Sequence, residues 1–411
     1  MTKKIAILTG EFGQGHLALA KKLKSHLDAL GHVDCVDVLN INRLIDEVFI
    51  ERSVWDRFRY AASHQLLYGY DEFTRLPAWL RSCHLVNVCS RFFSRFYAMI
   101  WGTASLVVYR KQERGAIKAK IEQYDCVFSV LSVPNHLLWT SQQEAVMVNV
   151  AQDYGQGVTT VWWGRFWDYH LSSDVLNAQV ASAYYHPETQ VKTVGPVYHV
   201  SDYGALSSNA GVDGKTSVLF IPGKTGNQPR FMRKLVSIAK SCLQRGHRVV
   251  WRGSEEVMLA ALLDIDPADR DRVTVQPYGP LDDLESFDLV VGKGSYNQIT
   301  ESLIKGVPFA CVTFLGYWER QNLCIQSEGA QLLDWSRSYV IPSPEQLISM
   351  RLEQVHSRDR LFTAPDEMAE VLREVTLIEK RLPAEPSVLR SPLCDFSGCR
   401  LEAGVPHKNH T

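Results

Sequence analysis

The residues with the clearest chemistry lie in glycine-bearing loops, each between an apolar run and an amphipathic segment. In the first loop, "LTGEFGQGHLALAKKL", Gly10, Gly13 and Gly15 precede His16. The positive end of a helix dipole disfavours the imidazolium form, so we expect a neutral ring that can accept a proton. The alternative is that His16 only caps its own helix. Glycines let a substrate approach the backbone closely, so Gly13 and Gly15 are expected to line a site.

A second loop, "LVVGKGSYNQITESL", has the residues of an anion site. Gly292, Gly294 and Ser295 can present backbone N–H groups at a helix N-terminus, whose dipole favours a negative charge. Lys293 adds a full positive charge. The loop therefore suits a phosphate group, and an ordinary turn with a solvent-facing lysine is the alternative.

These loops belong to strand–loop–helix units, the repeated element of α/β folds with parallel sheets. A third unit begins at Ser217 in "SVLFIPGKTGNQ", where Gly223 and Lys224 are further candidates for contact with an anion. A solvated side chain is the alternative for Lys224. Ligands of such folds gather at the carboxyl ends of strands, so we expect the three loops to converge on one site.

Length and composition predict two domains. A single core rarely grows beyond about 250–300 residues, and this chain has 411. A polar stretch rich in Ser, Gly and Asp separates two α/β patterns. The predicted ranges are 1–198 for an N-terminal domain with a helical insertion at about 43–120, 199–215 for a linker, 216–382 for a C-terminal domain and 383–411 for a mobile tail.

Charge and hydropathy exclude several classes of protein. A net charge of −1 argues against a general binder of nucleic acid. The chain contains no apolar run of about 18 residues, the length that spans a bilayer, and its first apolar run is too short for a signal peptide. The nine cysteines fit a reducing compartment, with Cys35, Cys126, Cys242 and Cys311 as small core residues. We therefore expect a cytoplasmic location.

Three segments together resemble a known family. "GEFGQGH" is similar to the glycine-rich loop of the glycosyltransferases that make monogalactosyl- and glucosyl-diacylglycerol, relatives of the peptidoglycan enzyme MurG, although Gln14 replaces a glycine. "GKGSYNQITESLIKGVPF" and "GYWERQNLCIQSEGAQLL" resemble two further motifs of these enzymes in the same order. The resemblance implies the GT-B fold, in which two Rossmann-like parallel-sheet domains face each other across a cleft. It also implies sugar transfer from a nucleotide sugar, usually with inversion and without a metal ion or cofactor.

Sugar transfer needs a base for the acceptor hydroxyl and neutralisation of the departing diphosphate. Glu301, placed on the first turn of the helix after Lys293, is expected to accept hydrogen bonds from the ribose, or else to stabilise the helix dipole. Asp153 in "VAQDYG" is the rival of His16 as base, and its alternatives are to orient His16 or to bind the acceptor. The donor sugar is expected at Glu319, Gln321 and Asn322, which otherwise cap a helix, and the acceptor at Gly13, Gly15, Trp162 and Trp163, where core packing is the alternative for the tryptophans.

Residues 49–101 alternate arginines with aromatic residues, as in "ERSVWDRFRY" and "SRFFSRFYAMIW". Such helices can rest on an anionic membrane surface or pack in a core with a solvated face. Stacking on nucleic acid is disfavoured by the net charge. In the tail, the spacing of Cys394, Cys399, His407 and His410 matches no zinc site.

The sequence thus predicts an inverting, metal-independent glycosyltransferase that uses a nucleotide sugar, most simply a UDP-sugar. Its hydroxyl acceptor is a lipid at the inner face of a membrane or a small soluble molecule. Two alternatives stay open. A nucleotide-sugar 2-epimerase on the same fold would need carboxylates around the sugar and no acceptor pocket, and a non-catalytic relative would bind without turnover.

Overall fold

The computed structural model shows two parallel β-sheets flanked by helices. It describes residues 2–10, 14–49, 53–59, 108–130, 145–151, 167–184, 188–198, 216–223, 229–253, 265–277, 283–312, 323–326, 329–335, 338–362 and 365–378, and the structural statements below concern these residues. All of them belong to one compact unit, Met1–Ile378. The predicted linker and tail, and most of the aromatic–arginine segment, lie outside the described residues.

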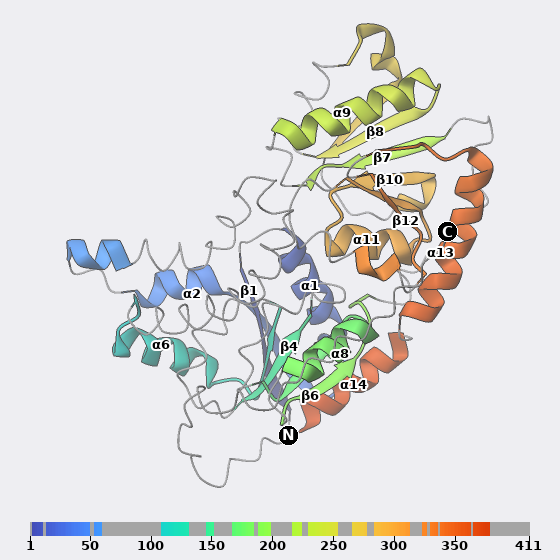
Figure 1. Ribbon diagram of the computed structural model, residues 1–411. Coiled ribbons are helices and arrows are strands. Elements are labelled where there is room, and N and C mark those ends of the chain that lie inside the picture. The colour runs from blue at the N-terminus through green and yellow to red at the C-terminus, as the bar shows by residue number, and fades with distance from the viewer. Residues whose placement is uncertain are drawn as a thin grey trace, which may run out of the picture. The chain divides into compact units, whose positions relative to one another are not determined.

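The first sheet contains six parallel strands in the order β2-β1-β3-β4-β5-β6 (Figure 1). They are β1 (Lys3–Thr9), β2 (Val33–Asn40), β3 (Cys126–Ser129), β4 (Val146–Val150), β5 (Tyr169–Ser172) and β6 (Gln190–Thr193). The helices of this part are α1 (Gln14–Asp28), α2 (Ile41–Val48), α6 (Lys111–Ile121), α8 (Val175–Tyr184) and a short helix at 54–59. The strand order reverses beside β1, which pairs with β2 on one side and β3 on the other. Ligands bind at such reversal points in open α/β sheets.

The second sheet also contains six parallel strands, in the order β12-β11-β10-β7-β8-β9. They are β7 (Ser217–Ile221), β8 (Arg248–Gly253), β9 (Val273–Pro277), β10 (Leu289–Gly292), β11 (Phe309–Cys311) and β12 (Leu332–Asp334). The α-helices are α9 (Pro229–Gln244), α11 (Tyr296–Ile304), α13 (Pro344–Leu361) and α14 (Pro365–Leu377), and the 3-10 helices are η4 (Pro267–Arg272), η5 (Leu284–Ser286) and η6 (Leu323–Gln326). The reversal point of this sheet lies beside β7, between β10 and β8.

Burial on both faces explains why the central strands read as unbroken apolar runs. Ile5, Ala6, Ile7 and Leu8 of β1 are all fully buried. Ile5 and Ile7 belong to one hydrophobic cluster, while Ala6 and Leu8 belong to another. Successive side chains of a strand point to opposite faces, so each face of the sheet has its own core. Parallel sheets covered by helices on both faces require this pattern.

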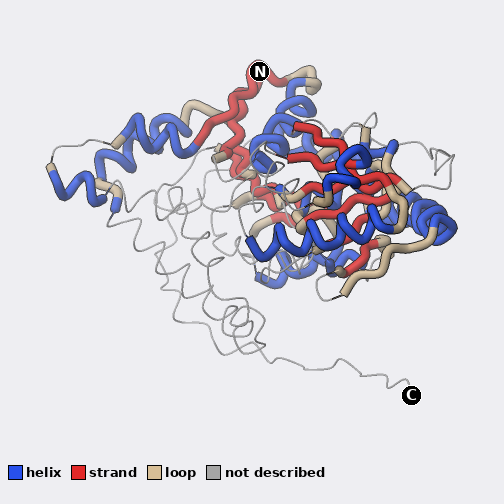
Figure 2. The backbone as a smooth tube through the Cα atoms, turned by 90° about the horizontal axis from the view of Figure 1, so that it is seen from above, coloured by secondary structure: helices blue, strands red, loops and turns tan. Residues whose placement is uncertain are grey.

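The predicted strand–loop–helix units are confirmed, with two additions that the sequence analysis did not make. Strand β12 was not predicted, because three residues at the edge of a sheet carry too little pattern. Helix α14 packs against the core of the first sheet through Met368, Leu372 and Val375. Figure 1 shows this helix beside the first sheet, and Figure 2 shows strands bordered by helices. In the same helix, Thr376 Oγ1 lies 2.8 Å from Nε2 of His32. Helix α14, from the end of the predicted C-terminal domain, thus completes the hydrophobic core of the first sheet.

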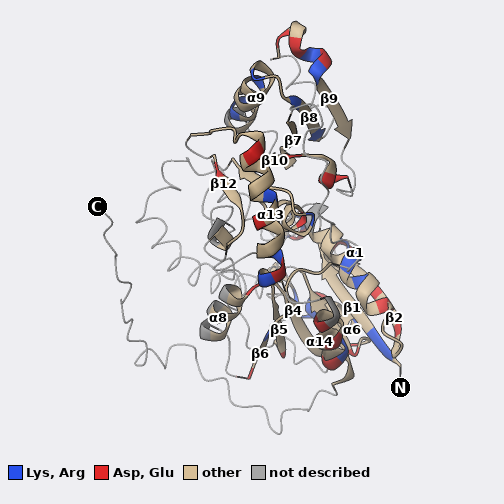
Figure 3. Cartoon of the chain, turned by 90° about the vertical axis from the view of Figure 1, so that its right-hand side faces the viewer, with Lys and Arg blue, Asp and Glu red and all other residues tan. Residues whose placement is uncertain are grey.

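Charges of both signs lie next to each other on the described helices. Figure 3 shows Lys or Arg beside Asp or Glu on α13 and α14 and at the far end of the second sheet, where η4 has the sequence PADRDR. This mixture agrees with the net charge of −1.

Candidate functional site

The loop between β10 and α11 carries the predicted anion-binding residues. Gly292 ends β10, and residues 293–295 lead directly into the helix. Gly294 has a φ of 82°, a left-handed conformation that glycine adopts without steric cost. Ser295 is the N-cap of α11, with a φ of −69° and a ψ of 152°, and forms a reciprocal capping box with Gln298. A helix start of this kind directs backbone N–H groups and the positive end of the dipole at an anion.

Gln298, which the sequence analysis did not single out, joins this loop to β7. Its Nε2 donates to the carbonyl oxygen of Ile221 at 2.9 Å, and its Oε1 accepts from the backbone N–H of Ser295 at 3.4 Å. A Cβ added to Gly292 would lie 2.9 Å from Oε1 of Gln298 and 3.1 Å from the carbonyl oxygen of Ile221, so a side chain there would force these neighbours to shift. The Ser-x-x-Gln spacing before an apolar helix was the available signal for Gln298.

Residues 222–223, which directly follow β7, lie beside the loop after β10, as the parallel pairing of these strands requires. Gly223 has a φ of 66°. A Cβ at Gly223 would lie 3.7 Å from Cε of Lys293, so the stem of this lysine runs past Gly223. Two of the three glycine-bearing loops therefore meet at the carboxyl edge of the second sheet.

His16 is half-buried on the first turn of α1, at the reversal point of the first sheet. Its Nδ1 lies 3.2 Å from the carbonyl oxygen of Val130, the residue after β3. A carbonyl oxygen can only accept, so this contact places the ring proton on Nδ1 and makes Nε2 the basic nitrogen of the neutral ring. Gly15, the second residue of α1, precedes it.

Glu301 lies on the second turn of α11, because the helix begins at Tyr296. The first-turn position given by the sequence analysis was therefore wrong by about one turn. Oε1 of Glu301 accepts a hydrogen bond from the hydroxyl of Tyr198 at 3.2 Å and lies 3.5 Å from Nζ of Lys22 on α1. The carboxylate is thus in contact with residues that precede the predicted linker.

The remaining predicted site residues are not described by the structure. Those outside the described residues are Gly13, Asp153, Trp162, Trp163, Lys224, Glu319, Gln321 and Asn322. Their predicted roles stay predictions.

A buried polar cluster that the sequence analysis missed connects β4, β5 and α8. His170 is fully buried; its Nδ1 lies 2.8 Å from Nδ2 of Asn149, and its Nε2 lies 3.1 Å from Oδ1 of Asn177. Ser172 also donates to Oδ1 of Asn177, at 2.7 Å. Burial lowers the pKa of His170 from 6.5 to about 4, so the ring is neutral near pH 7. Full burial keeps His170 away from any substrate, so its role is structural. His16 stays the candidate base.

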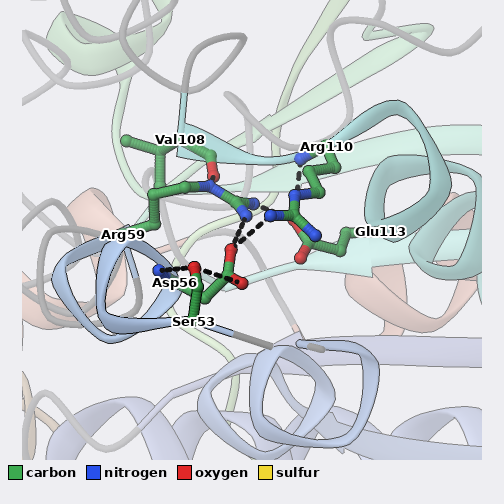
Figure 4. A network of polar contacts seen from close by, with 6 residues as sticks. All are labelled: Ser53, Asp56, Arg59, Val108, Arg110 and Glu113. Carbon is green, nitrogen blue, oxygen red and sulfur yellow. Dashed lines mark hydrogen bonds and ion pairs between the residues drawn. The ribbon is translucent and has the colours of Figure 1, made fainter. Parts of the chain in front are cut away.

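A buried ionic network joins residues 53–59, at the start of the aromatic–arginine segment, to residues 108–113, which follow that segment (Figure 4). Asp56 accepts from Nη1 of Arg59 at 2.7 Å and from Nη2 of Arg110 at 2.6 Å. Arg59 also contacts Glu113 and donates to the carbonyl oxygen of Val108 at 2.8 Å. Asp56, Arg59 and Glu113 are at most 5% exposed. The network holds residues 53–59 against residues 108–113.

The opposite face of the short helix at 54–59 is apolar and exposed. Val54 is 82% exposed, and Trp55 and Phe58 are each 63% exposed. The two rings stack with centroids 5.3 Å apart. This stretch thus buries Asp56 and Arg59 and exposes Val54, Trp55 and Phe58 together with Arg57, whereas an ordinary surface helix turns its apolar side chains inward.

Comparison with solved structures identifies the architecture. The apo structure of UGT2 from Phytolacca americana matches with a TM-score of 0.53 and 13% identity, over 91% of this chain and 99% of that one. The glycotransferase of kitacinnamycin matches with a TM-score of 0.52 and 16% identity, over 93% of this chain and 100% of that one. The chain has the GT-B fold. Each six-stranded sheet, with its flanking helices, is one of the two Rossmann-like domains of this fold. Comparisons with protein-family models and with curated proteins give no match.

The described residues show neither a metal-binding cluster nor a membrane-spanning helix. Within that part of the chain, no group of three or more His, Cys, Asp or Glu side chains is arranged to hold a metal ion. Among the helices built from described residues, none is long and apolar enough to cross a bilayer.

Proposed function

We propose that this GT-B protein is a glycosyltransferase that moves a sugar from a nucleoside-diphosphate sugar, most simply a UDP-sugar, to a hydroxyl acceptor. The observation that carries the proposal is the junction of the β7 and β10 loops. There, Gly223 and Gly294 both adopt left-handed backbone conformations beside Lys293, which supplies charge, and the capped start of α11 supplies oriented N–H groups. A diphosphate is the ligand that such a combination suits. We also propose that the chain belongs with the diacylglycerol glycosyltransferases and MurG, whose motifs it resembles.

In this proposal, the diphosphate leaving group is stabilised by protein groups without a metal ion. Lys293 and the N–H groups at the start of α11 offset the negative charge that develops as the sugar–phosphate bond breaks. Glu301 accepts hydrogen bonds from the ribose. Lys224 assists at the diphosphate, and the donor sugar lies against Glu319, Gln321 and Asn322.

His16 is the proposed base. As the acceptor oxygen forms its bond to the anomeric carbon, Nε2 takes the hydroxyl proton, and the bond pair to the donor phosphate leaves with the nucleoside diphosphate. A single displacement of this kind inverts the anomeric configuration. Asp153 is the alternative base, and Gly13, Gly15, Trp162 and Trp163 are the proposed acceptor-side residues.

The exposed apolar face at 54–59 supports a lipid acceptor and contact with an anionic membrane. Trp55 and Phe58 can enter the interfacial region of a bilayer, while the exposed Arg57 meets anionic headgroups. The ionic network beneath them holds this face outward. We therefore propose a cytoplasmic protein that binds reversibly to the inner face of a membrane.

Incubation with a panel of UDP-sugars, with and without diacylglycerol vesicles, tests the activity. Release of UDP with formation of a glycolipid supports transfer to lipid, and UDP release with a soluble glycoside supports a small-molecule acceptor. Epimerised UDP-sugar would replace the proposal with the isomerase. UDP binding without turnover of any sugar would replace it with a non-catalytic role.

A further inference from the structure

Lys22 and Tyr198, which have no role in the proposed mechanism, form a cluster with Glu301. They lie on α1, in the segment after β6, and on α11. Nζ of Lys22 lies 3.3 Å from the centroid of the Tyr198 ring and 3.5 Å from Oε1 of Glu301. The Tyr198 hydroxyl donates to the same Oε1 at 3.2 Å. Each of the three side chains therefore touches the other two.

The arrangement constrains the Glu301 carboxylate from one side. The Lys22 ammonium is held by a negatively charged oxygen and by the electron-rich face of an aromatic ring, both of which attract a cation. The contacts with Lys22 and Tyr198 converge on Oε1, so rotation of the carboxylate about its last side-chain bond is restricted. The side chains of Lys22 and Glu301 are 27% and 22% exposed, so water screens this ion pair only in part.

We infer that Lys22 is a positioning residue for Glu301, so that nucleotide affinity depends on a residue of the first Rossmann-like domain. This inference rests on the proposed role of Glu301 at the ribose. A carboxylate that binds a ribose diol must be ionised and correctly turned before the ligand arrives, and preorganisation raises affinity by lowering the ordering cost. The positive charge of Lys22 favours the ionised carboxylate, and the contacts from Lys22 and Tyr198 fix its orientation. The opposite arrangement, in which Lys22 competes with the ribose for Glu301, would raise affinity when Lys22 is removed.

The test is a double-mutant cycle read by titration calorimetry with UDP. Lys22→Met removes the ammonium and keeps the stem, and we expect about three- to fivefold weaker UDP binding. Tyr198→Phe removes only the hydroxyl and is expected to weaken binding in the same direction. Lys21→Met is the control, because Lys21 is the exposed neighbour on the same helix. In a Glu301→Ala background, Lys22→Met is expected to have no further effect.

The outcomes separate this inference from the proposed function. Loss of UDP affinity in Lys22→Met that disappears in the Glu301→Ala background supports it, and Lys22→Arg should then restore part of the affinity. Unchanged or tighter binding by Lys22→Met, with weakened binding by Glu301→Ala, overturns the positioning role alone. An equal loss in both backgrounds also overturns it, because Lys22 would then act without Glu301. Absence of UDP binding by the unmodified protein would instead contradict the proposed function.

Discussion

His16 shows how one backbone contact can prepare a side chain for chemistry. The Val130 carbonyl oxygen assigns the ring proton to Nδ1, so Nε2 is the nitrogen that can take a proton from an acceptor. His16→Asn keeps a side-chain donor for Val130 and removes the base. We expect turnover to fall by about 10²–10⁴-fold, the usual contribution of general-base catalysis, with the melting temperature nearly unchanged. Steady-state rates with a fixed UDP-sugar measure this.

The result that would count against His16 is turnover within a few-fold of the unmodified protein. If Asp153→Asn then abolished turnover while UDP binding persisted, Asp153 would be the base.

Gly292 is closely packed and also lies at the proposed diphosphate site, so its substitution is expected to affect both stability and UDP binding. Any Cβ there would press against Gln298 and against the backbone of Ile221, which cannot move away as a flexible side chain could. We expect Gly292→Ala to lower the free energy of unfolding by about 1–3 kcal/mol, as overpacking does, and to weaken UDP binding. Urea denaturation measures the first effect and calorimetry the second.

Gly115→Ala is the control: Gly115 lies inside α6 with nothing near its Cβ position, so alanine should stabilise the protein by about 0.5–1 kcal/mol. Equal stability changes in the two variants would refute this account of Gly292.

At the scale of elements, the buried cluster around His170 predicts a pH dependence of stability. The unfolded chain protonates this histidine near pH 6.5, whereas the folded protein does so only near pH 4. Between these values the unfolded state binds more protons, so stability falls as the pH falls. The shift corresponds to a stabilising contribution of about 3 kcal/mol, which is present in full above pH 6.5 and is lost as the pH falls to 4. Urea denaturation from pH 4 to 8 measures this slope, and His170→Gln should flatten it. A His170 ring that titrates near pH 6.5 by NMR would contradict the prediction.

Elements with a clear local sequence pattern could be predicted from the sequence. The central strands are apolar over their whole length, and the β10 loop combines glycines with a Ser-x-x-Gln cap, so both were predictable. Strand β12 has three residues and escaped detection. The starting residue of α11 depends on which residue caps it, which is why Glu301 was placed a turn too early. The contact between Lys22 and Glu301 joins residues 279 positions apart, and no local pattern encodes it.

At the scale of the whole molecule, the exposed apolar side chains of the short helix at 54–59 predict membrane binding. Trp55→Ser combined with Phe58→Ser should weaken binding to anionic vesicles by about tenfold or more, since burial of one large apolar side chain contributes about 1.5–3 kcal/mol. Binding by the unmodified protein should also fall as salt rises. Vesicle co-sedimentation measures both. Val340→Ser, which changes a 72% exposed apolar residue of the second domain, is the control. Equal binding to neutral and anionic vesicles, or unchanged binding by the double variant, would favour a soluble acceptor.

The central claim is that the second Rossmann-like domain of this GT-B protein holds a nucleoside diphosphate with Glu301 at its ribose. Calorimetric titration of UDP into the unmodified protein, Glu301→Ala and Glu353→Ala tests this directly. Glu353→Ala is the control, because Glu353 is an exposed glutamate on α13, a helix beside the second sheet. The account predicts saturable binding by the unmodified protein and by Glu353→Ala. It predicts a loss of about 1–3 kcal/mol in Glu301→Ala, as expected when hydrogen bonds to a charged group are removed. Equal UDP affinity in all three proteins, or no UDP binding by the unmodified protein, would contradict it.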